Sequence, residues 1–296
     1  MTYVLAIADR SYSSWSLRGW LTFARFDLPV TLRTATIYTP DFPAMLADFG
    51  LARTVPALRI EEDGRSFPLW ETPAIAETLA ERHPDRRFWP SDPARRALAR
   101  TLVAEMHAGF GALRNACPMN LRHAYAGFAA SDAVRAELAR IEALWDFARA
   151  ASGGAGPWLF GDYSLADVFY APIAARIAGY DLPVGPAGAG YVATHLADPE
   201  FRAWRAAGLA ENQVQQRYEL DLPRRPWPGP APLPARAVTG VAPANAACPF
   251  SGAPVAADSL AEVDGVVIGF CNPFCRDKVV ADPEAWPAAV TAAARG

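Results

Sequence analysis

The sequence predicts an α/β domain, an all-helical domain and a small α/β module with cysteines, in that order along the chain. Three observations lead to this fold class. Strand and helix patterns alternate over residues 1–84, whereas only helical patterns occur over 94–220. A proline-rich segment, 221–246, precedes a last stretch, 247–296, that holds three of the four cysteines. A chain of 296 residues, 52% of them hydrophobic, can bury more than one core.

Hydrophobic period and turn residues define the elements of the first domain. We expect strands at 2–8, 30–38, 55–60 and 66–70, and helices at 15–26, at 41–49 and from 72 to just before Pro84. Glu62-Asp63-Gly64 joins the last two strands as a hairpin. Thr72 suits the N-cap of the last helix and Pro73 its first position. The order β-α-β-α-β-β-α is that of a thioredoxin-like domain, although other small α/β folds share it.

The second domain is predicted from helical periodicity alone. The patterns cover 94–115, 132–152, 164–179 and 198–208. The clearest start signal is a capping box in which Ser164 caps the helix and Asp167 returns the hydrogen bond. The segment that follows contains seven prolines within 221–246, so we interpret it as a linker without regular structure.

Composition excludes several classes of protein. The 28 lysines and arginines are balanced by 31 acidic residues, and the formal net charge is −3, so we expect no nucleic-acid partner. No apolar run reaches the roughly 18 residues of a membrane span. The N-terminal apolar segment soon meets Asp9 and Arg10, so no signal peptide is indicated and we expect a cytoplasmic protein.

Three serines stand where the first strand enters its helix. The segment Arg10-Ser11-Tyr12-Ser13-Ser14-Trp15 places three hydroxyls at a helix N-terminus and has no glycine-rich phosphate loop. A free thiol has a pKa of about 8.5, and hydroxyl donors, unpaired amides and the positive helix end all favour its thiolate. This setting indicates activation of a thiol, with simple capping of the helix by the serines as the alternative.

The serine segment resembles the Ser-Ser-Cys-Ser-Trp-Arg-Val-Arg signature of zeta-class glutathione S-transferases. Residues 54–58, Thr-Val-Pro-Ala-Leu, are similar to the Val-Pro-Ala-Leu segment of that family, and Glu71-Thr72 looks like its Glu/Gln-Ser pair. The capping box at 164–167 also matches. The resemblance extends from residue 3 to about 217 and implies the glutathione S-transferase fold, a thioredoxin-like domain followed by an all-α domain.

The resemblance assigns roles to the serines. Ser11 takes the place of the catalytic serine, Ser13 takes that of a cysteine that assists glutathione binding, and Ser14 is the fallback. The chain departs from the zeta signature at Ser13 and at Ser16, which puts the maleylacetoacetate isomerase activity of that class in doubt. General transferase or peroxidase chemistry depends less on these two positions.

The resemblance also implies a glutathione site. Val55 and a cis Pro56 present a backbone edge to the cysteine of glutathione. Glu71 meets the γ-glutamyl ammonium, while Thr72 and nearby helix-terminal amides hold the α-carboxylate. The alternatives are that Pro56 only starts a strand and that Thr72 only caps a helix.

A second-substrate site is expected on the first long helix of the helical domain. The candidates are Met106, Phe110, Met119 and Arg122, with Arg114 and Asn120 nearby. Such an apolar, polarizable wall would suit a small hydrophobic electrophile, although methionine and phenylalanine at helical spacing also fit a core. A homodimer is implied by the resemblance alone. The four histidines show no ligand spacing.

The last stretch carries the pattern Cys248-x22-Cys271-x3-Cys275. Three thiolates brought together by a turn and a hairpin suit zinc or another thiophilic ion. So small a unit has little hydrophobic core and would need a bound metal ion to stabilise its fold. The pattern resembles the YHS/TRASH metal-binding module, with Asp277 and Asp282 as candidates for a fourth ligand. The alternative is a module held by packing without metal.

The sequence therefore predicts a glutathione S-transferase that activates the glutathione thiol for conjugation, reduction or isomerisation of a small electrophile. The competing hypothesis is a protein without catalytic activity that binds glutathione or another ligand, or that responds to metal. Fold alone does not decide between them.

Overall fold

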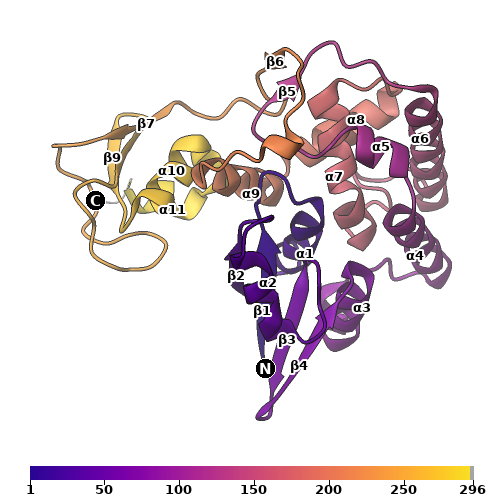
Figure 1. Cartoon of the computed structure of the whole chain (residues 1–296), viewed down its shortest axis with the longest axis horizontal. Helices are drawn as coiled ribbons and strands as arrows, with labels where there is room; N and C mark the ends of the chain where they lie inside the picture. The colour runs from indigo at the N-terminus through magenta and orange to yellow at the C-terminus, as the bar shows by residue number, and fades with distance from the viewer. Residues whose placement is uncertain (294–296) are drawn as a thin grey trace. The chain divides into compact units, whose positions relative to one another are not determined.

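The computed structural model describes residues 1–293 and contains two compact units (Figure 1). The N-terminal unit comprises Met1–Leu196 and Gln215–Pro228, and the C-terminal unit comprises Ala197–Val214 and the chain from Gly229 onward. The predicted fold class is confirmed, because the chain forms a thioredoxin-like α/β domain, a helical domain and a small cysteine-containing sheet module. Within the described part of the chain, no helix is both long and apolar enough to cross a membrane.

A four-stranded sheet of order β2-β1-β3-β4 forms the centre of the thioredoxin-like domain. Its strands are β1 (Thr2–Ala8), β2 (Thr31–Ala35), β3 (Ala57–Glu62) and β4 (Arg65–Trp70). Its helices are α1 (Ser14–Ala24), α2 (Asp41–Leu46) and α3 (Thr72–Arg82). Strand β2 runs parallel to β1. Strand β3 lies between β1 and β4 and pairs antiparallel with both. The predicted hairpin turn is present, with positive φ angles at Asp63 and Gly64.

The side chains of β1 point alternately to the two faces of the sheet and contribute to a hydrophobic core on each face. Val4, Ala6 and Ala8 pack with Met45 of α2 on one face of the sheet. The other face meets α1, where the rings of Tyr3 and Phe23 lie 5.5 Å apart. Because successive side chains of a strand point to opposite faces, the seven residues of β1 are enough to hold helices on both sides.

The helices over residues 93–210, the region predicted as the second domain, depart from prediction in two places. They are α4 (Pro93–Ala108), α5 (Gly111–Ala116), α6 (Asp132–Ser152), α7 (Leu165–Tyr180), α8 (Pro186–Ala197) and α9 (Pro199–Ala210). The predicted helix 94–115 is interrupted at Gly109 and Phe110, where Phe110 adopts φ 58°. Helix α8 was not predicted, because its Pro-Ala-Gly-Ala-Gly start has low helix propensity.

The capping box predicted at the start of α7 is confirmed. Ser164 and Asp167 make both reciprocal bonds, and almost every residue of α7 is buried. Two short strands, β5 (Ala124–Tyr125) and β6 (Arg224–Arg225), pair antiparallel and return the chain to the helical domain after α9.

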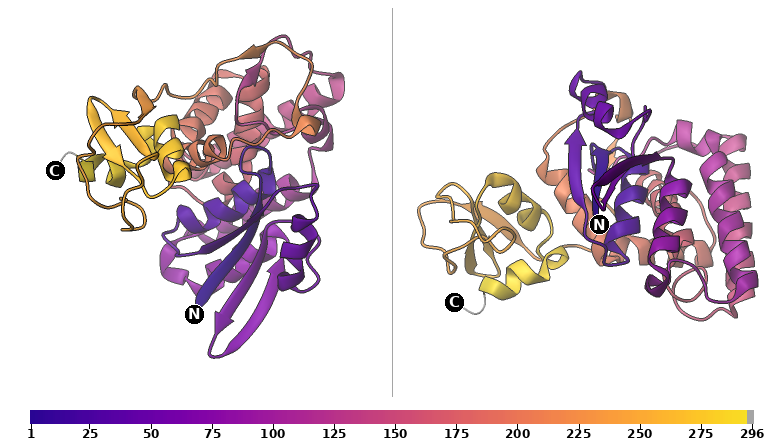
Figure 2. Two further views of the ribbon diagram at one scale, coloured as in Figure 1. Left: turned by 60° about the vertical axis from the view of Figure 1, so that its left-hand side comes forward. Right: turned by 90° about the horizontal axis from the view of Figure 1, so that it is seen from below.

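The C-terminal unit has its own sheet, of order β7-β8-β9 (Figure 2). Its elements are β7 (Ala235–Val238), β8 (Leu260–Val263), β9 (Val266–Gly269), α10 (Pro273–Ala281) and α11 (Pro287–Ala293), together with α9. Strand β7 lies inside the segment predicted as a linker, and it forms because Ala235–Val238 contains no proline and can pair with β8. Arg202 of α9 forms a two-point ion pair with Asp282, at 2.7 and 2.8 Å. Helix α9, which we had placed in the helical domain, thus belongs to the same compact unit as the cysteine module.

Candidate functional site

A cavity of about 230 Å³ in the N-terminal unit brings together the predicted glutathione-binding residues. Its lining consists of Trp15, Thr54, Val55, Pro56, Glu71, Thr72, His107 and Arg114. These residues come from the start of α1, the loop before β3, the junction of β4 and α3, the last turn of α4, and α5. All four residues assigned to glutathione from the sequence therefore face one space.

The Val55–Pro56 peptide is cis, as the resemblance implied. Helix α1 approaches this peptide closely at Gly19. A Cβ atom at residue 19 would lie 2.6 Å from the Cβ of Pro56, so only glycine permits the approach. The packing of α1 against Pro56 places the serine segment next to the cavity wall.

Glu71 has an uncommon backbone conformation at the start of α3. Its φ angle is 67°, which is rare outside glycine, and such conformations concentrate at functional sites. We expected Thr72 to be the N-cap, but Glu71 occupies that position and Thr72 is the first residue of the helix. The side chain of Glu71 is 58% exposed, so its carboxylate is accessible to a ligand.

The three serines have different surroundings. Ser13 is the N-cap of α1, where its Oγ accepts from the backbone N–H of Ser16 at 3.2 Å and donates to the Ser16 Oγ at 2.8 Å. The Ser14 Oγ accepts from Arg176 at 3.4 Å. Ser11 is 2% exposed, and its Oγ has no hydrogen-bond partner among residues 1–293. None of the three lines the cavity itself, although Trp15, which follows them, does.

Two buried arginines, Arg18 and Arg176, contact Ser14 in the serine segment. Arg18 donates to the carbonyls of Phe169 and Ser14, and Arg176 donates to that of Cys117. No carboxylate of the described chain is among the charged neighbours of either arginine. Burial lowers the pKa of both, that of Arg176 to about 10, and an arginine stays charged at neutral pH. These charges add to the positive potential at the N-terminal end of α1.

The predicted second-substrate residues do not line the cavity. Met106, Phe110 and Met119 are buried in the core, and Arg122 is partly buried. The cavity instead receives His107 and Arg114 from the same stretch of chain. We had noted Arg114 only as a neighbour and gave His107 no role, because one histidine without ligand spacing carries no signal in a sequence.

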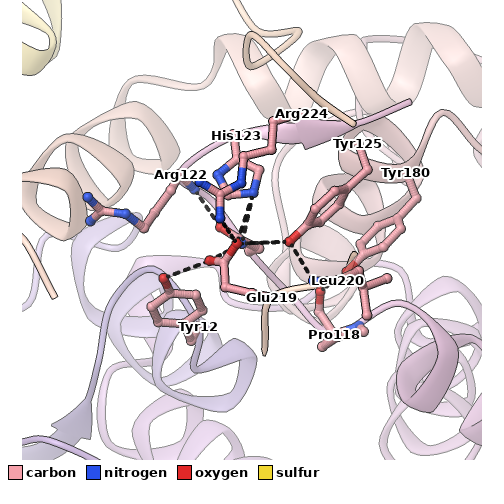
Figure 3. Close-up of polar contacts among 10 residues, drawn as sticks. Tyr12, Pro118, Arg122, His123, Tyr125, Tyr180, Glu219, Leu220 and Arg224 are labelled. Atoms are coloured by element: carbon pink, nitrogen blue, oxygen red, sulfur yellow. Dashed lines mark hydrogen bonds and ion pairs between the residues drawn. The ribbon is translucent and has the colours of Figure 1, made fainter. Parts of the chain in front are cut away.

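The carboxylate of Glu219 accepts a hydrogen bond from Tyr12, which lies within the serine segment (Figure 3). The side chain of Glu219 is 9% exposed. We call Glu219 and its polar partners the Glu219 cluster. The partners are Tyr12 at 3.3 Å, Asn120 at 3.0 Å, Tyr125 at 3.3 Å, Arg224 at 2.9 Å and His123 at 3.3 Å. Burial raises the pKa of Tyr12 to about 12, so its hydroxyl stays protonated and donates to Glu219. No local sequence pattern predicts this cluster, because Tyr12 and Glu219 lie 207 positions apart.

In the C-terminal unit, the predicted metal ligands lie together. The sulfur atoms of Cys248, Cys271 and Cys275 all lie within 4.8 Å of one another. Burial raises the pKa of Cys248, but hydrogen bonds from backbone N–H groups, that of Phe250 first, outweigh it and lower the pKa to about 6. Such a cluster of thiol groups can hold a thiophilic ion.

The two carboxylates considered as a fourth ligand have other partners. Asp282 forms its ion pair with Arg202, and Asp277 lies 2.7 Å from Arg276. Neither belongs to the cysteine group.

Comparison with known proteins agrees with this geometry. Residues 12–82 match the family model of the glutathione S-transferase N-terminal domain. The chain has the glutathione S-transferase fold. This match and the structural neighbours support the glutathione S-transferase family. No curated protein matches the sequence.

Solved glutathione S-transferase structures extend the likeness beyond the first domain. Maleylacetoacetate isomerase from Anaeromyxobacter dehalogenans, crystallised with glutathione in its active site, is 26% identical with a TM-score of 0.51. The alignment covers 75% of this chain and 98% of that one. Glutathione transferase Omega 2S from Trametes versicolor is 18% identical with a TM-score of 0.53, over 74% of this chain and 99% of that one, and it shows the shared fold alone. In this glutathione S-transferase fold, the cavity lies where the serine segment, the cis-proline loop and α3 meet.

Proposed function

We propose that the protein is a glutathione-dependent transferase that binds glutathione in the cavity and activates its thiol toward a small electrophile. The observation that carries this proposal is the convergence of Val55, Pro56, Glu71 and Thr72 on one cavity. The likeness to a glutathione-bound isomerase at 26% identity supports it. The sequence resemblance also leads us to propose a zeta-like subtype and a homodimer, and we keep the cytoplasmic location expected from the sequence as a further proposal.

The charged groups of the γ-glutamyl end of glutathione would each meet a group of opposite polarity in the cavity. The exposed carboxylate of Glu71 suits the γ-glutamyl ammonium. The first amides of α3, with the hydroxyl of Thr72, suit the adjacent α-carboxylate because the N-terminus of a helix favours anions. The resemblance implies that the backbone at Val55, which lines the cavity next to Pro56, would hydrogen-bond the cysteine residue of glutathione.

Activation would use the N-terminal end of α1. The thiol loses its proton to solvent, and the resulting thiolate sulfur forms the new bond to an electrophilic carbon. As it does so, either the bond from that carbon to its leaving group breaks and the group departs with the electron pair, or the π pair of an activated double bond moves to the far atom, which then takes a proton from water. Among the three serines, the hydroxyl of Ser13 is already donated to Ser16, and Ser14 accepts from Arg176. Ser11 is the one of the three whose Oγ has no hydrogen-bond partner of either kind among the described residues, so it remains our choice for the donor to the thiolate. Arg18 and Arg176 would lower the energy of the anion further.

The test is the ultraviolet thiolate absorbance of bound glutathione against pH, in the native chain and in Ser11→Ala, Ser13→Ala and Ser14→Ala. We expect the native chain to lower the thiol pKa by about one unit or more from its free value of about 8.5, and Ser11→Ala to remove most of that shift. An unshifted pKa with glutathione bound would favour a carrier without catalytic activity. A shift lost only in Ser13→Ala would move the role to that residue.

We also propose that Cys248, Cys271 and Cys275 bind zinc or another thiophilic ion. We expect the full chain to retain one Zn²⁺ after dialysis, and Co²⁺ to give a thiolate charge-transfer band, because three thiolates favour both ions. Cys271→Ala should lose both signals. Cys117→Ala is the matched control, since Cys117 is buried in the N-terminal unit, and it should keep them. Equal metal content in both variants would contradict the proposal.

A further inference from the structure

His107 joins α4 to the glutathione-binding end of α3. It lies in the last turn of α4 and lines the cavity, with its Nε2 atom 3.4 Å from the Oε2 atom of Glu71. Its Nδ1 atom is buried and has no hydrogen-bond partner in the part of the chain that the structure describes. Because Nε2 faces the Glu71 carboxylate and Nδ1 faces no partner, a neutral ring with its hydrogen on Nε2 points that hydrogen toward Glu71.

The groups around His107 oppose its protonation. Burial lowers the pKa of His107, Glu71 raises it, and the guanidinium groups of Arg18 from α1 and Arg114 from α5 lower it further. Both arginines lie over the ring of Trp15, at 4.5 and 4.9 Å, and that ring meets the edge of His107.

A second cavity also borders His107, and the two charged residues that line it, Glu77 and Arg100, form an ion pair with each other. The pair lies on the α3 side of α4 at a distance of 2.7 Å. Burial and the guanidinium groups of Arg18 and Arg114 therefore favour the neutral ring of His107 over the imidazolium at pH 7.

We propose that His107 is a positioning residue, which holds the Glu71 carboxylate for the γ-glutamyl ammonium while neutral and withdraws it when protonated. This inference rests on the proposed glutathione-binding function. A neutral imidazole gives the carboxylate one hydrogen bond and leaves its charge for the ligand. An imidazolium forms an ion pair with the same oxygen and competes with the ammonium, so glutathione affinity falls in acid.

The test uses the full chain and S-methylglutathione, whose sulfur cannot ionise, so that activation of the thiol does not enter. Affinity is measured by titration calorimetry from pH 5.5 to 8.0, where the ammonium and carboxylates of this ligand keep their charges. One competing proton changes affinity by at most tenfold per pH unit, and we expect affinity to fall as the pH is lowered from 7.5, with a slope below that limit.

Two variants separate His107 from other titrating groups. His107→Gln keeps a neutral donor near Glu71 and should bind with a pH-independent affinity, between the acid and neutral values of the native chain. His83→Gln is the control, because His83 lies beyond the end of α3 and contacts Tyr3 instead of the cavity. It should retain the native pH profile.

The outcomes separate this inference from the proposed function. If the native chain does not bind S-methylglutathione at any pH, the proposed function fails. If it binds with the same affinity across the range, or if His107→Gln keeps the native slope, the role of His107 is overturned while glutathione binding stands. Circular dichroism at pH 5.5 checks that each variant remains folded.

Discussion

Asp167→Ala is expected to lower the free energy of unfolding by about 3–5 kcal/mol. Asp167 is fully buried and accepts four hydrogen bonds, from the backbone N–H groups of Leu159 and Ser164 and the hydroxyls of Ser164 and Tyr191. Alanine would leave these donors buried without acceptors, at a cost of about 1–3 kcal/mol each that does not add fully. Thermal unfolding should shift down by roughly 5–15 °C.

The matched control for this variant is Asp162→Ala. Asp162 is an exposed aspartate five positions earlier, before the same helix, and its loss should change stability by less than about 0.5 kcal/mol. Asp167→Asn should fall between the two, because an amide keeps one acceptor and adds a donor that the site cannot satisfy. Equal unfolding temperatures for Asp167→Ala and Asp162→Ala would show that the capping box does not hold α7 in place.

The features predicted correctly from sequence are those fixed over a few residues. The capping box needs only Ser164 and Asp167, and the hairpin turn needs only Asp63-Gly64, because both are specified by local backbone geometry. The interruption at Phe110 was missed, since its apolar neighbours continue the helical period across the break. Strand β7 was missed because the surrounding prolines outweighed four residues able to pair.

The candidate site was predictable only in part for a related reason. Val55-Pro56 directly precedes β3 and Glu71-Thr72 directly follows β4, and the antiparallel pairing of Ala57 with Trp70 brings the two motifs to the same end of the sheet. His107 reaches the same cavity only through the packing of α4, which no local pattern encodes. The Glu219 cluster likewise depends on the chain returning after α9.

Glu219→Ala is expected to affect both stability and thiol activation. The change would leave the hydroxyls of Tyr12 and Tyr125 and the amide of Asn120 without their shared acceptor. Removal of one partner from a buried charged network costs about 3–5 kcal/mol, and the exposed Arg224 contributes little of this. Denaturant unfolding of the full chain measures the loss.

The effect on activation follows from the position of Tyr12. It lies between Ser11 and Ser13, and the Ser11 carbonyl accepts from Leu121 in the loop that also carries Asn120. Without Glu219, Tyr12 and this loop lose their common anchor, so the hydroxyls at the start of α1 lose their fixed position. We expect the pKa of bound glutathione to rise toward its free value of about 8.5 in Glu219→Ala.

Asp221→Ala provides the comparison for Glu219→Ala. Asp221 is an exposed acid two positions away on the same segment, and it has no place in the Glu219 cluster. Its removal takes away the same charge and should leave both the unfolding free energy and the thiol pKa near their native values. A Glu219→Ala protein that loses stability but keeps the native thiol pKa would limit the cluster to a structural role. Loss of neither property would contradict the anchoring of the serine segment by Glu219.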